Sequence, residues 1–417
     1  MNELYHHQRK TVEETPSKWG LWFRMRVGKT PPAIRLACKY TKSAIIICPK
    51  SIKFNWEKEI AIWNNTDCEF TVVPISQFRI KYKQLPKAEA IIFDEVHACG
   101  GNYRSQGFKA VKAYIKYHSV DYIWLLTGTP YTASPWSVYS YSELLGRNWN
   151  WYAFKKTFFD EFKIGALPRP GQRDLRKVIT IPKKGMEAKL QELLCKLGTV
   201  IDLKDVAEVV DDEDIIEYFE LNAEQKRLMK EYVDPNAMTQ YTKYHQIESG
   251  LVLGDGYVED LEFECPKDKR LLEICESNDK TMVVCRFRNQ IAKYEKLLEK
   301  TGIKIFKIMG GKKLTASEVA EIAEKEERAI ILVQCDTVAG YSLKSFSLIV
   351  FASMSYSFVN FDQVKFRTKD MTKTTPNQYI YLLTQGDSID NAIYNNVINK
   401  QNFSLELYAK SKYKKTT

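Results

Sequence analysis

The chain of 417 residues is 44% hydrophobic, so it can bury a sizeable core and is more readily explained by two domains than by one. Its formal net charge of +10 at pH 7 suits a polyanionic partner, although a solvated basic surface is an equally good interpretation. The lack of an apolar N-terminal core, of a run approaching ~20 apolar residues and of a Cys-x-x-Cys pair argues against secretion, a membrane span and a zinc site, so we expect a cytoplasmic protein with reduced thiols.

The first third of the chain alternates apolar runs with helical patterns. Runs that are typical of buried strands occupy residues 19–23, 44–48, 70–73, 90–93 and 122–126. Between them, apolar residues recur at helical spacing, for example over residues 33–37 and 54–63. This alternation predicts an α/β fold with a parallel, doubly wound sheet.

Gly28, Lys29 and Thr30 lie between the first apolar run and the first helical pattern. At the start of a helix the backbone N–H groups and the dipole favour a phosphate, Lys29 can reach terminal phosphates, and Thr30 can ligate Mg²⁺. The full phosphate-loop pattern has a glycine five residues before Gly28, where this chain has Phe23. The match is partial, and it gains weight only beside a matching acidic strand end.

Asp94 and Glu95 supply that acidic strand end. They follow the apolar run 90–93, and ligands of open α/β sheets bind at the carboxyl ends of the strands. Two carboxylates placed there beside a phosphate loop indicate metal and water chemistry on a nucleotide.

The middle of the chain differs in composition from the first third. Residues 149–159 are rich in aromatics, which favours packing against their own lobe over stacking with bases. The prolines and glycine of residues 167–173 predict a loop, whose Arg169 and Arg173 are candidates for phosphate contact. The acidic run 211–214 is most simply a solvated connector, and the basic residues 410–415 a frayed tail.

A second alternating pattern follows. Apolar runs occupy residues 282–285, 303–306, 329–333, 348–351 and 379–383, and helical segments such as 291–300 and 316–327 separate several of them. We therefore expect two α/β lobes of similar kind, of which the second has no phosphate loop.

The order of these motifs resembles the superfamily-two helicases, and among them the Swi/Snf-type double-stranded DNA translocases in the compact form that phages encode. The resemblance covers nearly the whole chain. The matching segments in the first half are residues 4–8, 25–30, 94–97 (Asp-Glu-Val-His) and 125–130, with Asn102 and Ser105 after the acidic box. In the second half they are residues 339–343, 363–367, 382–384, 387–390 and 393–394. No single motif is specific, but six in the family's order make a strong pattern.

The resemblance implies two RecA-like lobes, each a mainly parallel sheet flanked by helices, with a helical connecting region. The first lobe with its extension would span residues 1–204 and the second residues 205–417. ATP would bind with Mg²⁺ held by Thr30 and Asp94, and Lys29 and Gly28 would lie at the phosphates.

The resemblance also implies roles for individual side chains. Glu95 would orient or deprotonate the attacking water, Gln8 would read adenine, and Arg367 would reach the phosphates from the second lobe. The coupling of nucleotide state to DNA would fall to Thr127, Gly128 and Thr129.

The sixth motif, residues 363–367, departs from the family pattern. Family members usually have a second arginine three residues after the first. In that register this chain has Asp370, preceded by Lys369. Such an arginine contributes roughly 10³ to 10⁵ in rate. Either Arg367 or Lys369 supplies the charge, or hydrolysis is slow, or the motif aligns with a gap.

The functional expectation is an ATP-dependent DNA translocase or helicase that remodels duplex, forked or branched DNA, as in branch migration. The first alternative is an RNA or single-strand unwinding helicase, and the second is a clamp that binds ATP and nucleic acid without hydrolysis. If the chain is encoded by a phage, it would act in the host cytoplasm in DNA recombination or repair. The sequence does not identify phage or host protein partners.

Overall fold

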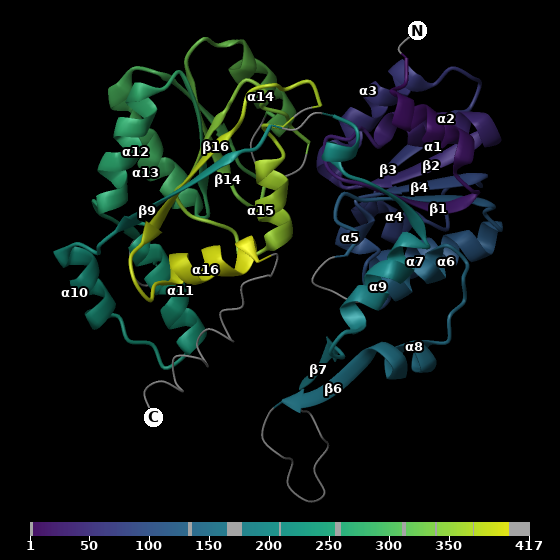
Figure 1. Ribbon diagram of the computed structural model, residues 1–417, viewed down its shortest axis with the longest axis horizontal. Coiled ribbons are helices and arrows are strands. Elements are labelled where there is room, and N and C mark those ends of the chain that lie inside the picture. The colour runs from purple at the N-terminus through teal and green to yellow at the C-terminus, as the bar shows by residue number, and fades with distance from the viewer. Residues whose placement is uncertain are drawn as a thin grey trace, which may run out of the picture. The chain divides into compact units, whose positions relative to one another are not determined.

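The computed structural model describes residues 3–131, 136–164, 177–207, 210–254, 260–310, 314–337, 340–369 and 371–399. It divides into two compact units, Met1–Val206 and Ala207–Thr417, which Figure 1 shows in purple to teal and in teal to yellow. Among the described residues, no helix has both the length and the apolar character needed to cross a membrane.

The first unit is built on a six-stranded sheet in which all strand pairs are parallel. Its order is β3-β2-β4-β5-β1-β8. The strands are β1 (Lys18–Phe23), β2 (Ser43–Cys48), β3 (Glu69–Pro74), β4 (Ala90–Asp94), β5 (Tyr122–Leu126) and β8 (Gly198–Ile201). The first five are those expected from the apolar runs. The four-residue strand β8 was missed because its Gly-Thr-Val-Ile sequence is too short to show a pattern.

Helices cover both faces of this sheet (Figure 1). On one side lie α1 (His6–Glu14), α2 (Thr30–Tyr40) and α3 (Lys53–Trp63), which follows the short η1 (Lys50–Ile52). The other side carries α4 (Ile75–Lys81), α5 (Val96–Cys99), α6 (Gln106–His118), α7 (Ser137–Leu144) and α9 (Met186–Cys195). Their apolar faces pack on alternate residues of β2, β4 and β5 in one core, as buried parallel strands require.

The aromatic segment forms α8 (Trp151–Phe158) and runs into a two-stranded antiparallel sheet of β6 (Phe159–Ile164) and β7 (Lys177–Pro182). Trp151 lies 4.8 Å from Trp136 and Trp149 lies 5.5 Å from Phe154, between ring centroids. These rings pack against the core of the first unit, so the interpretation as packing is confirmed for them. Tyr152 is 78% exposed. Residues 167–173 and 410–415 lie outside the described residues.

The second unit repeats the architecture with the strand order β13-β14-β12-β15-β16-β9, again all parallel. The strands are β9 (Glu213–Phe219), β12 (Lys280–Cys285), β13 (Lys304–Ile308), β14 (Ala329–Gln334), β15 (Leu348–Phe351) and β16 (Gln378–Thr384). One core packs α12 (Pro266–Ser277) and α13 (Arg288–Leu298) on one face. Another packs α14 (Ala316–Lys325), α15 (Phe358–Lys365) and α16 (Ile389–Ile398) on the opposite face. The expected pair of RecA-like lobes is confirmed.

The interpretation of the acidic run 211–214 as a solvated connector was wrong for Glu213 and Asp214, whereas Asp211 and Asp212 precede the strand that these two begin. Glu213 begins strand β9, which pairs with β16 along its whole length. Asp214 Oδ1 lies 2.8 Å from Lys365 Nζ and accepts a hydrogen bond of 2.7 Å from Tyr381 Oη. Consecutive charges concealed the strand because its partners are cations and hydroxyls that lie more than 150 residues away in the sequence.

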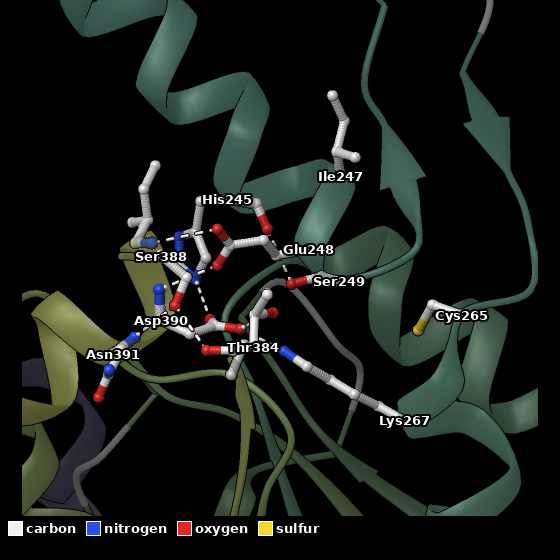
Figure 2. Close-up of polar contacts among 12 residues, drawn as sticks. His245, Ile247, Glu248, Ser249, Cys265, Lys267, Thr384, Ser388, Asp390 and Asn391 are labelled. Atoms are coloured by element: carbon white, nitrogen blue, oxygen red, sulfur yellow. Dashed lines mark hydrogen bonds and ion pairs between the residues drawn. The ribbon is translucent and has the colours of Figure 1, made fainter. Parts of the chain in front are cut away.

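A buried polar cluster ties the C-terminal helix to the second unit (Figure 2). Asp390, in the first turn of α16, forms an ion pair with Lys267 of α12 and lies 3.3 Å from His245 Nε2 of α11 (Ala237–Glu248). All three side chains are at most 2% exposed. Burial opposes the charge on Asp390, but Lys267 and His245 outweigh it and lower the pKa of that carboxyl. Glu248 accepts hydrogen bonds from Ile389 N and Asp390 N, at 3.1 and 2.9 Å.

We expect Lys267→Met to be strongly destabilising, because it leaves the Asp390 carboxylate buried without its main counter-charge. Breaking such a pair from one side costs about 3–5 kcal/mol. A matched control is Lys296→Met, which removes an exposed 3.1 Å pair with Glu262 and should cost less than about 1 kcal/mol. The free energies of unfolding from urea titration would compare them. Equal losses in the two variants would refute the assigned role of the cluster.

Candidate active site

The phosphate loop joins the end of β1 to the start of α2. Two of its residues adopt a left-handed backbone, Arg26 with φ 68° and Gly28 with φ 76°. Gly28 tolerates this conformation without the penalty that a Cβ brings, which accounts for its position immediately before Lys29. Helix α2 then opens with Thr30 and two prolines, whose fixed φ suits a first helical turn.

Side chains of helix α1 contact the backbone of this loop. Gln8, which is 2% exposed, donates from Nε2 to the carbonyl oxygen of Gly28 over 2.9 Å. Its Oε1 accepts from Tyr5 N at 3.0 Å, and the ring of His7 lies with Nε2 2.9 Å from Val27 O. Gln8 thus contacts the phosphate loop, and its side-chain amide holds the loop backbone.

The two predicted carboxylates, Asp94 and Glu95, lie at the end of β4 and have different surroundings. Asp94 is 3% exposed, and its Oδ2 accepts a 2.9 Å hydrogen bond from Trp56 Nε1 of α3. Its Oδ1 accepts from Glu95 N at 2.8 Å. Glu95 has a left-handed backbone, with φ 48°, which is uncommon for a residue with a side chain. The turn directs the two carboxylates to the same neighbour.

That neighbour is Lys29. Its Nζ lies 2.7 Å from Glu95 Oε1 and 3.4 Å from Asp94 Oδ1. Burial alone would lower the pKa of Lys29, but Asp94 and Glu95 outweigh burial and raise it, so the ammonium stays charged. For Asp94, burial raises the pKa and Lys29 opposes the shift. The structure therefore assembles the three residues that the sequence linked only by motif order.

His97 continues the network toward the next strand. Its Nδ1 lies 3.3 Å from Glu95 Oε2 and 2.8 Å from Thr127 Oγ1, at the end of β5. Thr127 Oγ1 also accepts from Thr129 N at 3.0 Å. Burial lowers the pKa of His97, so the imidazole is neutral at pH 7 and its tautomer is set by these two neighbours. Thr127 thus contacts the acidic box through the His97 ring, and Thr129 is linked to it through the Thr127 hydroxyl.

Gly128 lies against the phosphate loop itself. A Cβ at this position would lie 3.1 Å from Met25 Cγ and 3.2 Å from Met25 N, tighter than most real contacts. The segment 127–129 therefore contacts both the acidic box, through His97, and the loop before Lys29, through Met25.

The donor set fits Mg²⁺ bound together with a nucleotide. No cluster of three or more His, Cys, Asp or Glu residues that could hold a metal is found in the described part of the chain. Mg²⁺ is usually held by one or two carboxylates plus substrate phosphates and waters rather than by an all-protein cage. Asp94, together with the hydroxyl of Thr30 beside Lys29, provides a set of that kind.

Arg367 belongs to the second unit. Its Nη1 donates to Tyr341 O at 3.2 Å, and the guanidinium lies 5.1 Å from the Tyr341 ring centroid. Lys369 forms an ion pair with Asp212. Asp370 lies outside the described residues, as does Ala339 of the matching segment 339–343.

Two residues of this site were not assigned a role from the sequence. Trp56 was read only as an apolar residue of a helix, and no local signal shows that its indole N–H reaches Asp94. His97 was recognised inside the acidic box but given no task. Its place two residues after Glu95 is a signal that could have found it, once β5 was placed next to β4.

Comparisons with known proteins give a limited result. No protein-family model matches the chain, and no curated protein matches it. Among solved structures, the chain is similar to the SWI2/SNF2 ATPase core of Sulfolobus solfataricus in complex with double-stranded DNA. The TM-score is 0.42 and the sequence identity 17%, over 98% of this chain and 92% of that chain.

The Trp56–Asp94 contact predicts a measurable cost. Trp56→Phe keeps most of the buried ring but removes the donor to a buried carboxylate, which should cost about 1–3 kcal/mol in the free energy of unfolding. The matched control is Trp63→Phe in the same helix, where the indole faces the partly exposed Glu59 and the cost should be below about 1 kcal/mol. Urea titration of both variants decides, and an unchanged Trp56→Phe protein would contradict the assignment.

Proposed function

We propose that the protein is an ATP hydrolase whose turnover drives movement on DNA. The observation that carries the proposal is the position of Lys29 Nζ, 2.7 Å from Glu95 and 3.4 Å from Asp94, beside the first turn of α2. A cation at a helix N-terminus that faces two carboxylates at a strand end is the constellation used for phosphoryl transfer.

Each residue then has a task in hydrolysis. Lys29 exchanges its carboxylate partners for the β and γ phosphates of ATP when the nucleotide binds. Glu95, freed from that ion pair, orients or deprotonates the attacking water. Mg²⁺, when held by Asp94 and Thr30 with the nucleotide, neutralises charge on the phosphates. Gln8 holds the carbonyl oxygen of Gly28, and its proposed second task is to read adenine.

The His97 ring connects Glu95 to the segment 127–129. It contacts Glu95 on one side and Thr127 on the other, so a rearrangement of Glu95 on ATP binding alters a contact of the segment 127–129. We propose that this segment transmits nucleotide state to the DNA-binding face. Thr127 and Thr129 are buried, and the Thr127 hydroxyl holds Thr129 N, so the segment would act through its backbone.

The second lobe would supply Arg367 to the phosphates. Lys369 is less suited to that task, because its ammonium is paired with Asp212. This pairing, with Asp370 in the place of the usual arginine, favours a second candidate function. In that alternative the protein is a clamp that binds ATP and nucleic acid with little hydrolysis.

DNA is the proposed partner because of the motif order and the net charge of +10. Duplex, forked or branched DNA is favoured, with branch migration or fork remodelling as the task. Contacts would be mainly to phosphates, so affinity should fall steeply with salt. An RNA or single-strand helicase is the remaining alternative.

Glu95→Gln should retain nucleotide binding and lose turnover. The change removes the base but leaves Lys29, so the Kd for ATP should stay within about threefold while kcat falls by about 10²- to 10⁴-fold. Glu89→Gln, an exposed change just before the same strand, is the control and should leave both quantities unchanged. Wild-type turnover in Glu95→Gln would mean that another group activates the water.

Steady-state ATP hydrolysis with different nucleic acids tests the proposal as a whole. The purified protein would be assayed alone and with single-stranded DNA, linear duplex, a four-way junction and RNA. Stimulation of at least about tenfold by duplex or junction DNA is expected, and preference for RNA would favour the unwinding helicase. Measurable ATP binding without hydrolysis under any condition would favour the clamp.

A further inference from the structure

Two cysteines meet where α2 ends and β3 begins. Cys38 lies in the last turns of α2 and is half-buried, whereas Cys68 directly precedes β3 and is 5% exposed. Each thiol is the main cause of the shift in the other's pKa, and both cysteines contact Asn64. They are separated by 29 residues of sequence that include β2 and α3. The fold, rather than a local motif, brings them together.

Polar neighbours hold the two thiols in this arrangement. The Cys38 thiol donates to Asn64 Oδ1 over 3.2 Å, and Asn64 Nδ2 donates to Cys68 O over 2.9 Å. On the other side Thr41 Oγ1 lies 3.9 Å from Cys68 Sγ and donates to Ala37 O at 2.9 Å. One amide and one hydroxyl therefore fix both cysteines, and Cys38 is the thiol that solvent reaches.

The pair differs chemically from the other buried thiols. The neighbouring Cys68 lowers the pKa of the Cys38 thiol to about 6, with smaller support from Thr66 and Asn65. Burial instead raises the pKa of Cys48 and of Cys275, each to about 12. Thiolates are the nucleophiles of disulfide exchange, so these shifts favour Cys38 over Cys48 and Cys275 as the attacking thiol.

We propose that Cys38 and Cys68 are a redox modification site, at which a small disulfide such as oxidised glutathione converts the two thiols into an intramolecular disulfide. This proposal is independent of the proposed ATPase function.

The exchange proceeds in two balanced steps. The Cys38 thiolate attacks one sulfur of oxidised glutathione, which forms a mixed disulfide at Cys38 and releases one glutathione thiolate. Cys68 then loses its proton to solvent and attacks the Cys38 sulfur, which forms the protein disulfide and releases the second glutathione thiolate. The protein loses two electrons and two protons, and oxidised glutathione becomes two glutathione molecules.

The cross-link would fasten the helix that carries the phosphate loop to the edge strand β3. Closing a loop of this length restricts the unfolded chain, so the oxidised protein should melt about 5 °C or more above the reduced protein. In a reducing cytosol the dithiol is the resting form, and the disulfide would appear under oxidative conditions and be reversed by thiols.

Peptide mapping tests the proposal on the full chain. The folded protein would be treated with oxidised glutathione, its remaining thiols blocked with N-ethylmaleimide, and the product digested with trypsin without reduction. Cleavage after Arg35, Lys39, Lys58 and Arg79 places the two cysteines on separate peptides, residues 36–39 and 59–79. Mass spectrometry should find these peptides joined, with a mass about 2 Da below their sum.

Cys195 is an internal reference, since it is an exposed thiol. It should carry glutathione as a mixed disulfide in the same sample. Cys68→Ser should trap the mixed disulfide on Cys38, and Cys38→Ser should leave Cys68 unmodified. Reduction with dithiothreitol should restore the original peptides and melting temperature.

Three outcomes would overturn the proposal. Cys38 could carry glutathione without any joined peptides, both cysteines could stay unmodified while Cys195 reacts, or the joined form could melt below the reduced protein. The last result would show a cross-link that the native fold does not accommodate.

Discussion

The contact of one ammonium with two carboxylates organises the first unit. Lys29 and the Asp94–Glu95 pair come from elements more than 60 residues apart, and they meet because β1 and β4 both end at the carboxyl edge of one parallel sheet. Trp56 holds Asp94, Gln8 holds the loop before Lys29, and His97 contacts Glu95. Each of these supports reaches the site from a different element, so the geometry depends on the whole lobe.

The second unit uses buried charge for a different purpose. Asp390, Lys267 and His245 come from the three helices α16, α12 and α11, and Asp390 contacts the other two. Buried ion pairs are poor sources of net stability but lose much when one partner is removed. The cluster therefore fixes the register of α16 against α11 and α12. Glu95 of the first unit is partly exposed, whereas the side chains of Asp390, Lys267 and His245 in the second unit are at most 2% exposed.

Much of this structure could be predicted from the sequence, because parallel strands buried on both faces leave continuous apolar runs. Runs such as 44–48 and 329–333 appear as strands in the structure, and Asp94 and Glu95 were located by the rule that ligands bind at strand ends. Strand β9 was missed because its charges are paired with distant residues, and β8 because it is short. The links from Trp56 to Asp94 and from His97 to Thr127 were also missed. They depend on the strand order, and no local pattern reports which helix faces which strand.

The prolines that open α2 affect how the site would select its ligand. A helix start normally offers several free N–H groups to an anion, but Pro31 and Pro32 have none. Anion recognition at this end would therefore depend on the Lys29 ammonium and on the loop before it, which also contains Arg24 and Arg26. Such a site would distinguish ligands by where their negative charge is concentrated. The geometry of a set of backbone N–H donors would matter less. The site would also release a ligand readily once its negative charge has been divided between two products.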